Sequence, residues 1–194
     1  MELWHAWNCP YCMRVRAALE EKGVPWTGRE VDLGSKPAGL LALNPKGGVP
    51  VLVDGGTIVV ESLAILEHMD GRSPEPSLFP QRIGREAVKL AYDRMNGLFA
   101  PHLPKVARGS PDERSAALGE VRRALVALDE EIPGSGYLLG AFSAADLALA
   151  SFVAKLPAAW RPVPMGLDGL ARWERAVMER PAVRDQVAAR AAPR

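Results

Sequence analysis

Segments typical of strands and of helices alternate over residues 1–72, whereas every regular segment after residue 80 is helical in pattern. The alternating part reads strand, helix, strand, helix, strand, strand, helix. Its most definite element is a hairpin, since the β-branched runs "VPVLV" and "TIVV" flank the turn Asp54-Gly55-Gly56. This order predicts an α/β region followed by an all-α region.

We therefore expect a domain boundary between the two patterns. The α/β domain covers residues 1–72, a linker covers 73–80, and an all-helical domain covers 81–194. The linker "SPEPSLFP" is rich in proline, which interrupts both helices and strands. Two helices of the second domain begin with capping signals, Ser110 followed by Pro111, and Ser143 placed three residues before Asp146.

Charge and hydropathy narrow the class of protein. The 194 residues carry a net charge of +1, which favours neither a nucleic acid nor an anionic membrane as a partner. The start of the chain has no basic segment before an apolar run, so we expect no secretory signal. The most apolar later stretch, "SAADLALASFVAKL", is too short to span a bilayer. We expect a cytoplasmic protein.

The chain has two cysteines, Cys9 and Cys12, which bracket a proline and a tyrosine. A structural zinc site needs four ligands, and the three histidines are scattered, so we expect no metal. Covalent haem attachment needs a histidine after the second cysteine, where this chain has Met13. A structural disulfide fits poorly with a reducing cytoplasm.

Two interpretations of the pair remain, buried inert thiols and a redox centre. Both cysteines lie where the first strand gives way to the first helix, with Pro10 in the first turn. Cys9 would then sit at the helix N-terminus, where unpaired N–H groups and the helix dipole favour a thiolate. Cys12, one turn later, could attack a mixed disulfide formed on Cys9. This position favours the redox interpretation.

Four motifs in the same order resemble the glutathione S-transferase superfamily, and the resemblance covers nearly the whole chain. They are "CPYC" after the first strand, "NPKGGVPVL", "ESLAIL" and, in the helical part, "SAAD". The cysteine-type members fit best: omega-class transferases, dehydroascorbate reductases and two-domain glutaredoxins. The resemblance implies a thioredoxin-like βαβαββα domain followed by an all-α domain, with glutathione as cosubstrate and Cys9 as the reacting group.

The resemblance also implies a glutathione site. Val49 would pair with glutathione through its backbone, and Pro50, the next residue, would be cis. Glu61 would hold the ammonium group and Ser62 the γ-glutamyl carboxylate, with Lys36 near the glycine carboxylate. These assignments have plainer alternatives. Val49 and Pro50 could belong to a loop that enters a strand, Ser62 could only be a helix N-cap, and Lys36 could be a surface lysine.

A second-substrate pocket is implied as well. Trp7 and Asn8 would border it before Cys9. The first helix of the second domain would contribute further residues at helical spacings: Tyr92, Met95, Asn96 and Phe99. The alternative is that several of these residues belong to the core. A homodimer is possible, although Lys46 stands where the family often has an aromatic or apolar residue that contacts a partner subunit.

The sequence thus predicts a glutathione-dependent thiol transferase or disulfide reductase that acts through Cys9 on a small electrophilic or disulfide substrate. One alternative is a transferase or isomerase that activates the thiol of glutathione itself. Another is a non-catalytic glutathione-binding module.

Overall fold

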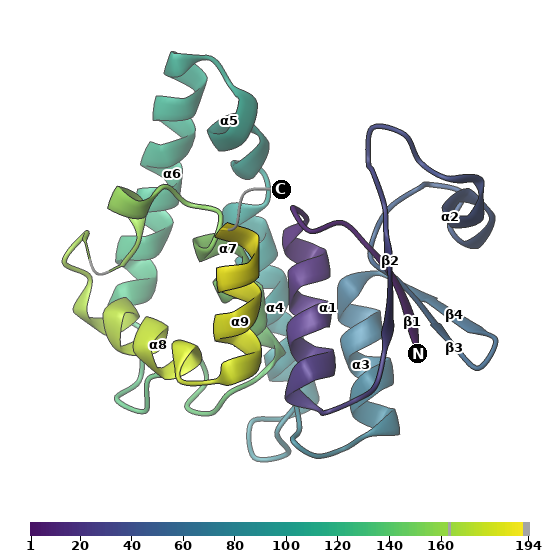
Figure 1. The fold of residues 1–194 in the computed structure, drawn as a ribbon. Helices are drawn as coiled ribbons and strands as arrows, with labels where there is room; N and C mark the ends of the chain where they lie inside the picture. The colour runs from purple at the N-terminus through teal and green to yellow at the C-terminus, as the bar shows by residue number, and fades with distance from the viewer. Residues whose placement is uncertain (163, 192–194) are drawn as a thin grey trace. The chain divides into compact units, whose positions relative to one another are not determined.

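A computed structural model describes residues 1–162 and 164–191, and these residues pack as two compact units (Figure 1). The first, which we call the sheet unit, is Met1–Phe79 together with the segment that begins at Pro181. The second, the helical unit, is Pro80–Arg180. We describe each unit by itself.

The described strands of the sheet unit form one mixed sheet in the order β2-β1-β3-β4. The strands are β1 (Glu2–His5), β2 (Thr27–Glu30), β3 (Val51–Asp54) and β4 (Thr57–Val60). β1 and β2 are parallel, whereas β1 and β3, and β3 and β4, are antiparallel. The predicted hairpin is present, and both turn glycines, Gly55 and Gly56, have positive φ, at 55° and 91°. Positive φ at two successive positions matches the strand twist.

Helices α1 (Pro10–Glu21), α2 (Ala38–Leu43), α3 (Ser62–Arg72) and α9 (Pro181–Ala191) complete the sheet unit. α1 packs against both α3 and α9, and every residue from Cys12 to Leu19 is buried (Figure 1). The buried stretch includes Arg14 and Arg16, so neither arginine lies on the surface. A buried ion pair, Lys22 to Asp70 at 2.9 Å, joins the end of α1 to α3.

The helical unit contains α4 (Arg85–Phe99), α5 (Leu103–Arg108), α6 (Pro111–Asp129), α7 (Ala144–Val153), the 3-10 turn η1 (Ala158–Trp160) and α8 (Asp168–Met178). α7 is buried along its whole length and packs on α4, where Phe152 stacks on Phe99 with ring centroids 5.8 Å apart. Both predicted helix starts are present. Ser110 and Glu113 exchange the two hydrogen bonds of a capping box, and the Asp146 carboxylate accepts the backbone N–H of Ser143 at 2.9 Å.

The packing differs from the expected domain division in one respect. The expected second domain, 81–194, includes the last helix, whereas α9 packs on α1 as part of the sheet unit. α9 buries the apolar side chains of Ala182 and Val183, and its Gln186 makes two polar contacts to α1, described below. Residues 192–194 of that expected domain lie outside the described residues.

Two short elements of the helical unit were not predicted from the sequence. α5 was missed because Pro101 and Pro104 indicate a break, yet Pro104 lies in the first turn of α5, where no N–H is needed. η1 is the other. Within the described ranges, no helix has the length and apolar character needed to cross a membrane.

Candidate active site

Cys9 lies at the start of α1. It is the N-cap residue, with extended backbone angles of −85° and 121°, and Pro10 follows in the first turn. The Cys9 N–H donates to the carbonyl oxygen of Ala6 at 3.2 Å, which closes the loop between β1 and the helix. The Cys9 side chain is partly exposed. The sulfur therefore sits at the positive end of a 12-residue helix, within reach of solvent.

Cys12 is fully buried one turn further along α1, and both thiols are free. Its sulfur accepts a hydrogen bond from the N–H of Ala6 at 3.5 Å. Burial raises the pKa of the Cys12 thiol far above its ordinary value, and a hydrogen bond with Cys9 and the charge of Cys9 raise it further. Cys12 therefore stays protonated at neutral pH and can donate its proton toward the Cys9 sulfur.

Val49 and Pro50 lie beside Cys9. The Cys9 sulfur is 3.8 Å from the carbonyl oxygen of Val49, and the peptide bond between Val49 and Pro50 is cis, as predicted from the family resemblance. β1 and β3 pair Trp4 with Val51. The chain that leaves β1 toward Cys9 and the chain that enters β3 through Pro50 consequently meet at the same edge of the sheet.

Glu61 and Ser62 reach that same edge. β3 and β4 pair Val51 with Val60, so Glu61 follows β4 next to the point where Pro50 enters β3. Glu61 is the N-cap of α3 and has a φ of 69°, in the left-handed region that non-glycine residues rarely adopt. Its side chain is exposed, whereas Ser62, the first residue of α3, is buried.

Lys36 packs over Gly47, two residues before Val49. Gly47 has a φ of 64°, and a Cβ there would come within 2.6 Å of the Lys36 Cδ and 3.0 Å of its Nζ. Only glycine leaves room for the lysine stem in this position. The Lys36 ammonium group thus lies close to Gly47 and near the Val49–Pro50 segment, although the residue as a whole is exposed.

Known proteins share this architecture. A family model described as "Glutathione S-transferase, N-terminal domain" matches residues 3–77. The stringent starvation protein A homolog of Histophilus somni is 33% identical over 159 residues, which is 81% of this chain and 72% of that protein. The chain belongs to the glutathione S-transferase superfamily.

Solved transferase structures extend the likeness to both units. The rice glutathione transferase OsGSTU1, in complex with glutathione, matches with a TM-score of 0.84 and 27% identity, over 95% of this chain and 89% of that one. Glutathione transferase Omega 3C from Trametes versicolor matches with a TM-score of 0.79 and 28% identity, over 95% and 87%. The predicted fold, a thioredoxin-like domain plus a helical part, is confirmed.

Two groups of residues were expected to form the second-substrate pocket. Trp7 and Asn8 lie in the loop before Cys9, where Asn8 is exposed and Trp7 is half-buried. In the helical unit, Asn96 is half-buried, whereas Tyr92, Met95 and Phe99 are each at most 1% exposed. These three pack as core residues, which is the alternative weighed above. A role in substrate binding stays a prediction for both groups.

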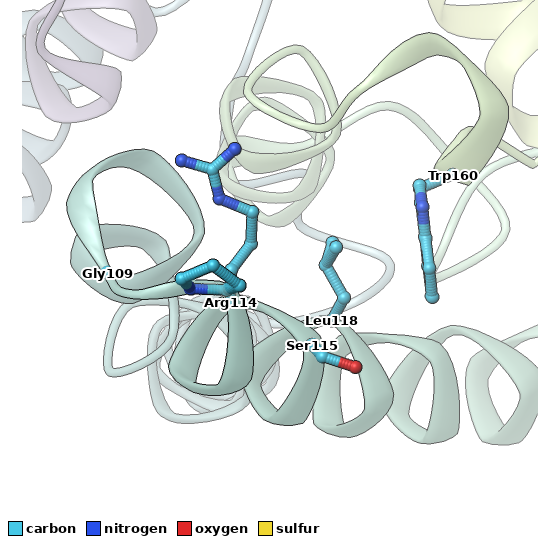
Figure 2. Close-up of a pocket in the computed structure, with 6 residues that line it drawn as sticks. Gly109, Arg114, Ser115, Leu118 and Trp160 are labelled. Carbon is cyan, nitrogen blue, oxygen red and sulfur yellow. The ribbon is translucent and has the colours of Figure 1, made fainter.

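A separate pocket of about 410 Å³ lies in the helical unit (Figure 2). It is lined by the residue that ends α5, by residues of the first half of α6 and by one residue of η1: Gly109, Pro111, Arg114, Ser115, Leu118 and Trp160. Its polar lining residues, Arg114 and Ser115, are exposed, and it contains no thiol or histidine. We therefore do not assign any thiol chemistry to this pocket.

Sequence reasoning missed one group of residues at the thiol site. Arg16 is fully buried and touches the loop before Cys9, while Gln186 on α9 touches Arg16. A signal was present, because Arg16 lies four residues after Cys12 and so shares its helix face. No comparable signal pointed to Gln186. The part of the chain that the structure describes has no cluster of three or more potential metal ligands.

Proposed function

We propose that this protein is a glutathione-dependent thiol transferase that reduces disulfides through Cys9. The observation that carries the proposal is the position of the Cys9 sulfur, at the N-terminus of α1 and 3.8 Å from the carbonyl of Val49, next to cis-Pro50. A reactive thiol beside an open backbone segment can meet the thiol of a bound peptide. Glutathione is such a peptide.

Two interactions stabilise the Cys9 thiolate. The N–H groups of the first turn of α1 and the helix dipole favour negative charge at the N-cap. The protonated thiol of Cys12, held in the buried position beneath, donates a hydrogen bond to the Cys9 sulfur. Both interactions stabilise the charged form of Cys9 more than its neutral form.

The edge of the sheet supplies the groups that glutathione requires. The Val49 backbone can pair with the cysteinyl residue of glutathione by β-addition. The first turn of α3, with Ser62, suits the γ-glutamyl carboxylate, and the exposed carboxylate of Glu61 suits the adjacent ammonium group. Lys36, held over Gly47, complements the glycine carboxylate.

The reaction follows thiol–disulfide exchange. The Cys9 thiolate attacks the glutathione sulfur of a substrate disulfide R–S–SG, so a Cys9–SG bond forms and RS⁻ leaves to take up a proton. A second glutathione thiolate then attacks the Cys9–SG disulfide, releasing GSSG and regenerating the Cys9 thiolate. In net terms, R–S–SG and one glutathione give RSH and one GSSG, so the disulfide bond passes from the substrate to glutathione.

Cys12 offers a second route for the same intermediate. After losing its proton, it can attack the Cys9 sulfur, so a Cys9–Cys12 disulfide forms and glutathione leaves as a thiolate. Two further glutathione molecules then reduce that disulfide. The raised pKa of Cys12 makes this attack slow, because little of the Cys12 thiolate is present at neutral pH.

The test is reduction of a glutathione mixed disulfide, followed by NADPH oxidation through added glutathione reductase. Cys9→Ser should lose activity by about 1000-fold or more because the thiolate is the nucleophile. The matched variant Cys12→Ser should retain most of the activity through the glutathione-resolved route. Full turnover by Cys9→Ser would overturn the proposal.

The likeness to OsGSTU1 in complex with glutathione favours a second candidate, conjugation of glutathione to an electrophile. In that reaction the protein would activate the glutathione thiol, and Cys9 would not form a covalent bond. Conjugation of an aryl halide at the same rate by wild type and by Cys9→Ser would support this candidate over the first.

A further inference from the structure

The C-terminal helix reaches the loop in front of the thiol through one buried arginine. Arg16, on α1, donates from Nη1 to the carbonyl oxygen of Ala6 at 3.3 Å. The same carbonyl accepts the N–H of Cys9 at 3.2 Å. A single backbone oxygen therefore joins the guanidinium to the amide of the reactive cysteine.

The guanidinium touches the residues on both sides of Ala6 as well. Nη1 lies 3.3 Å from the His5 Nδ1, and the guanidinium carbon lies 4.3 Å from the centre of the Trp7 ring. The N–H of Ala6 is bound to the sulfur of Cys12. Arg16 thus contacts the last residue of β1, His5, and the next two residues, Ala6 and Trp7, which belong to the loop tied to both cysteines.

Gln186 of α9 holds Arg16 from the other side. Its Oε1 accepts from the Arg16 Nε at 2.6 Å, and its Nε2 donates to the Glu20 carboxylate at 2.6 Å. Both Arg16 and Gln186 are buried, at 0% and 4% exposed. A buried guanidinium is costly unless its donors are satisfied. Gln186 satisfies the Nε donor of that guanidinium, and its amide lies between the Arg16 cation and the Glu20 carboxylate.

We propose that Arg16, fixed by Gln186, is a positioning residue that holds the Ala6–Asn8 loop in the shape that places the Cys9 sulfur at the helix N-terminus. The C-terminal helix is thereby part of the machinery that sets thiol reactivity. The proposal deepens the proposed function, on which its catalytic consequence rests. Its physical core, the coupling between Gln186 and Cys9, can be measured without any glutathione substrate.

The main test is the alkylation rate of Cys9 by iodoacetamide as a function of pH, in a Cys12→Ser background so that one thiol reacts. Gln186→Met keeps the side-chain volume and removes both hydrogen bonds. We expect the rate at neutral pH to fall about tenfold, and its pH midpoint to rise, because the sulfur is less well placed. Arg184→Gln, an exposed change on the same helix, is the matched control.

A double-mutant cycle separates positioning from general stability. Arg16→Met and Gln186→Met should each slow alkylation, and the double variant should be no slower than the more affected single variant, because both act through one contact. Circular dichroism and urea unfolding establish that each variant is folded under the assay conditions.

The outcomes distinguish the two proposals. If Gln186→Met lowers the unfolding midpoint but leaves the alkylation rate and its pH midpoint at the values of the Cys12→Ser parent, α9 only stabilises the fold and the inference is wrong. If alkylation changes as expected while wild type shows no mixed-disulfide reduction, the positioning role stands and the proposed function fails.

Discussion

The sulfur of Cys12 accepts a hydrogen bond from the N–H of Ala6 at 3.5 Å. The carbonyl oxygen of Ala6 accepts hydrogen bonds from Arg16 and from the Cys9 N–H, so one residue of the loop connects the Cys12 thiol and the Cys9 backbone to the buried arginine. This arrangement makes the two cysteines chemically unequal, since one is held in the interior and the other is left at the helix end.

The inequality predicts selective modification. Iodoacetamide at pH 7 should label Cys9 alone, with Cys12 reacting at least about 100-fold more slowly, because Cys12 is buried and its pKa is raised. Peptide mass spectrometry checks the site. Both cysteines should be labelled after unfolding in urea, and equal labelling in the folded protein would contradict the assignment.

The buried carboxyl of Asp146 predicts an unusual pH dependence of stability. It accepts hydrogen bonds from Leu138, Ser143 and Trp173, yet burial raises its pKa from the ordinary value of 3.8 to about 6. A raised folded-state pKa gives stability that is present below pH 3.8 and is lost as the pH rises through about 6. The loss attributable to this group is about 3 kcal/mol.

Urea unfolding between pH 4 and pH 7 checks this dependence. The free energy of unfolding of wild type should fall across this range relative to that of Asp146→Asn, which cannot titrate at this position. The comparison uses the change with pH, because the substitution also alters the hydrogen bonds. Equal pH dependence of the two proteins would show that Asp146 does not titrate in this range.

The buried pair of Lys22 and Asp70 predicts a large stability loss when one partner is removed. Lys22 donates from Nζ to Asp70 at 2.9 Å and to the carbonyl oxygens of Ser73 and Pro76 at 2.6 and 2.9 Å. Lys22→Met leaves a buried carboxylate without its cation and should lower the free energy of unfolding by about 3–5 kcal/mol.

The exposed pair of Arg29 and Glu2 is the matched control for that prediction. Its donor and acceptor are also 2.9 Å apart, but the arginine side chain is 58% exposed. Arg29→Met should change the free energy of unfolding by less than about 1 kcal/mol. Similar losses for the two substitutions in urea unfolding would mean that burial does not decide the value of these pairs.

The positive φ of Glu61 predicts that two substitutions at this position have the same effect on glutathione affinity but different effects on stability. Glu61→Gly and Glu61→Ala both remove the carboxylate proposed to hold the ammonium group of glutathione, so calorimetry should show the same loss of affinity for both. Glycine adopts a φ of 69° freely, so Glu61→Gly should be more stable than Glu61→Ala by about 1 kcal/mol. Unequal affinities would place the backbone, and not the carboxylate, in the binding role.

The sequence by itself determined the local features of this protein. The turn at Gly55-Gly56, the start of α1 at Cys9 and the capping at Ser110 each depend on residues within a few positions of one another, so their patterns could be read directly. The order of these elements was enough to predict the mixed fold.

The tertiary structure alone decided how the thiol site is supported. Arg16 could belong to a surface or to a core, and 170 positions separate it from Gln186, which holds it. Hydrogen bonds and burial between such distant residues leave no periodic signal, because they arise only when the packed helices bring the side chains together. For the same reason, the last helix was expected with the helical domain, while in the structure its polar contacts join it to α1.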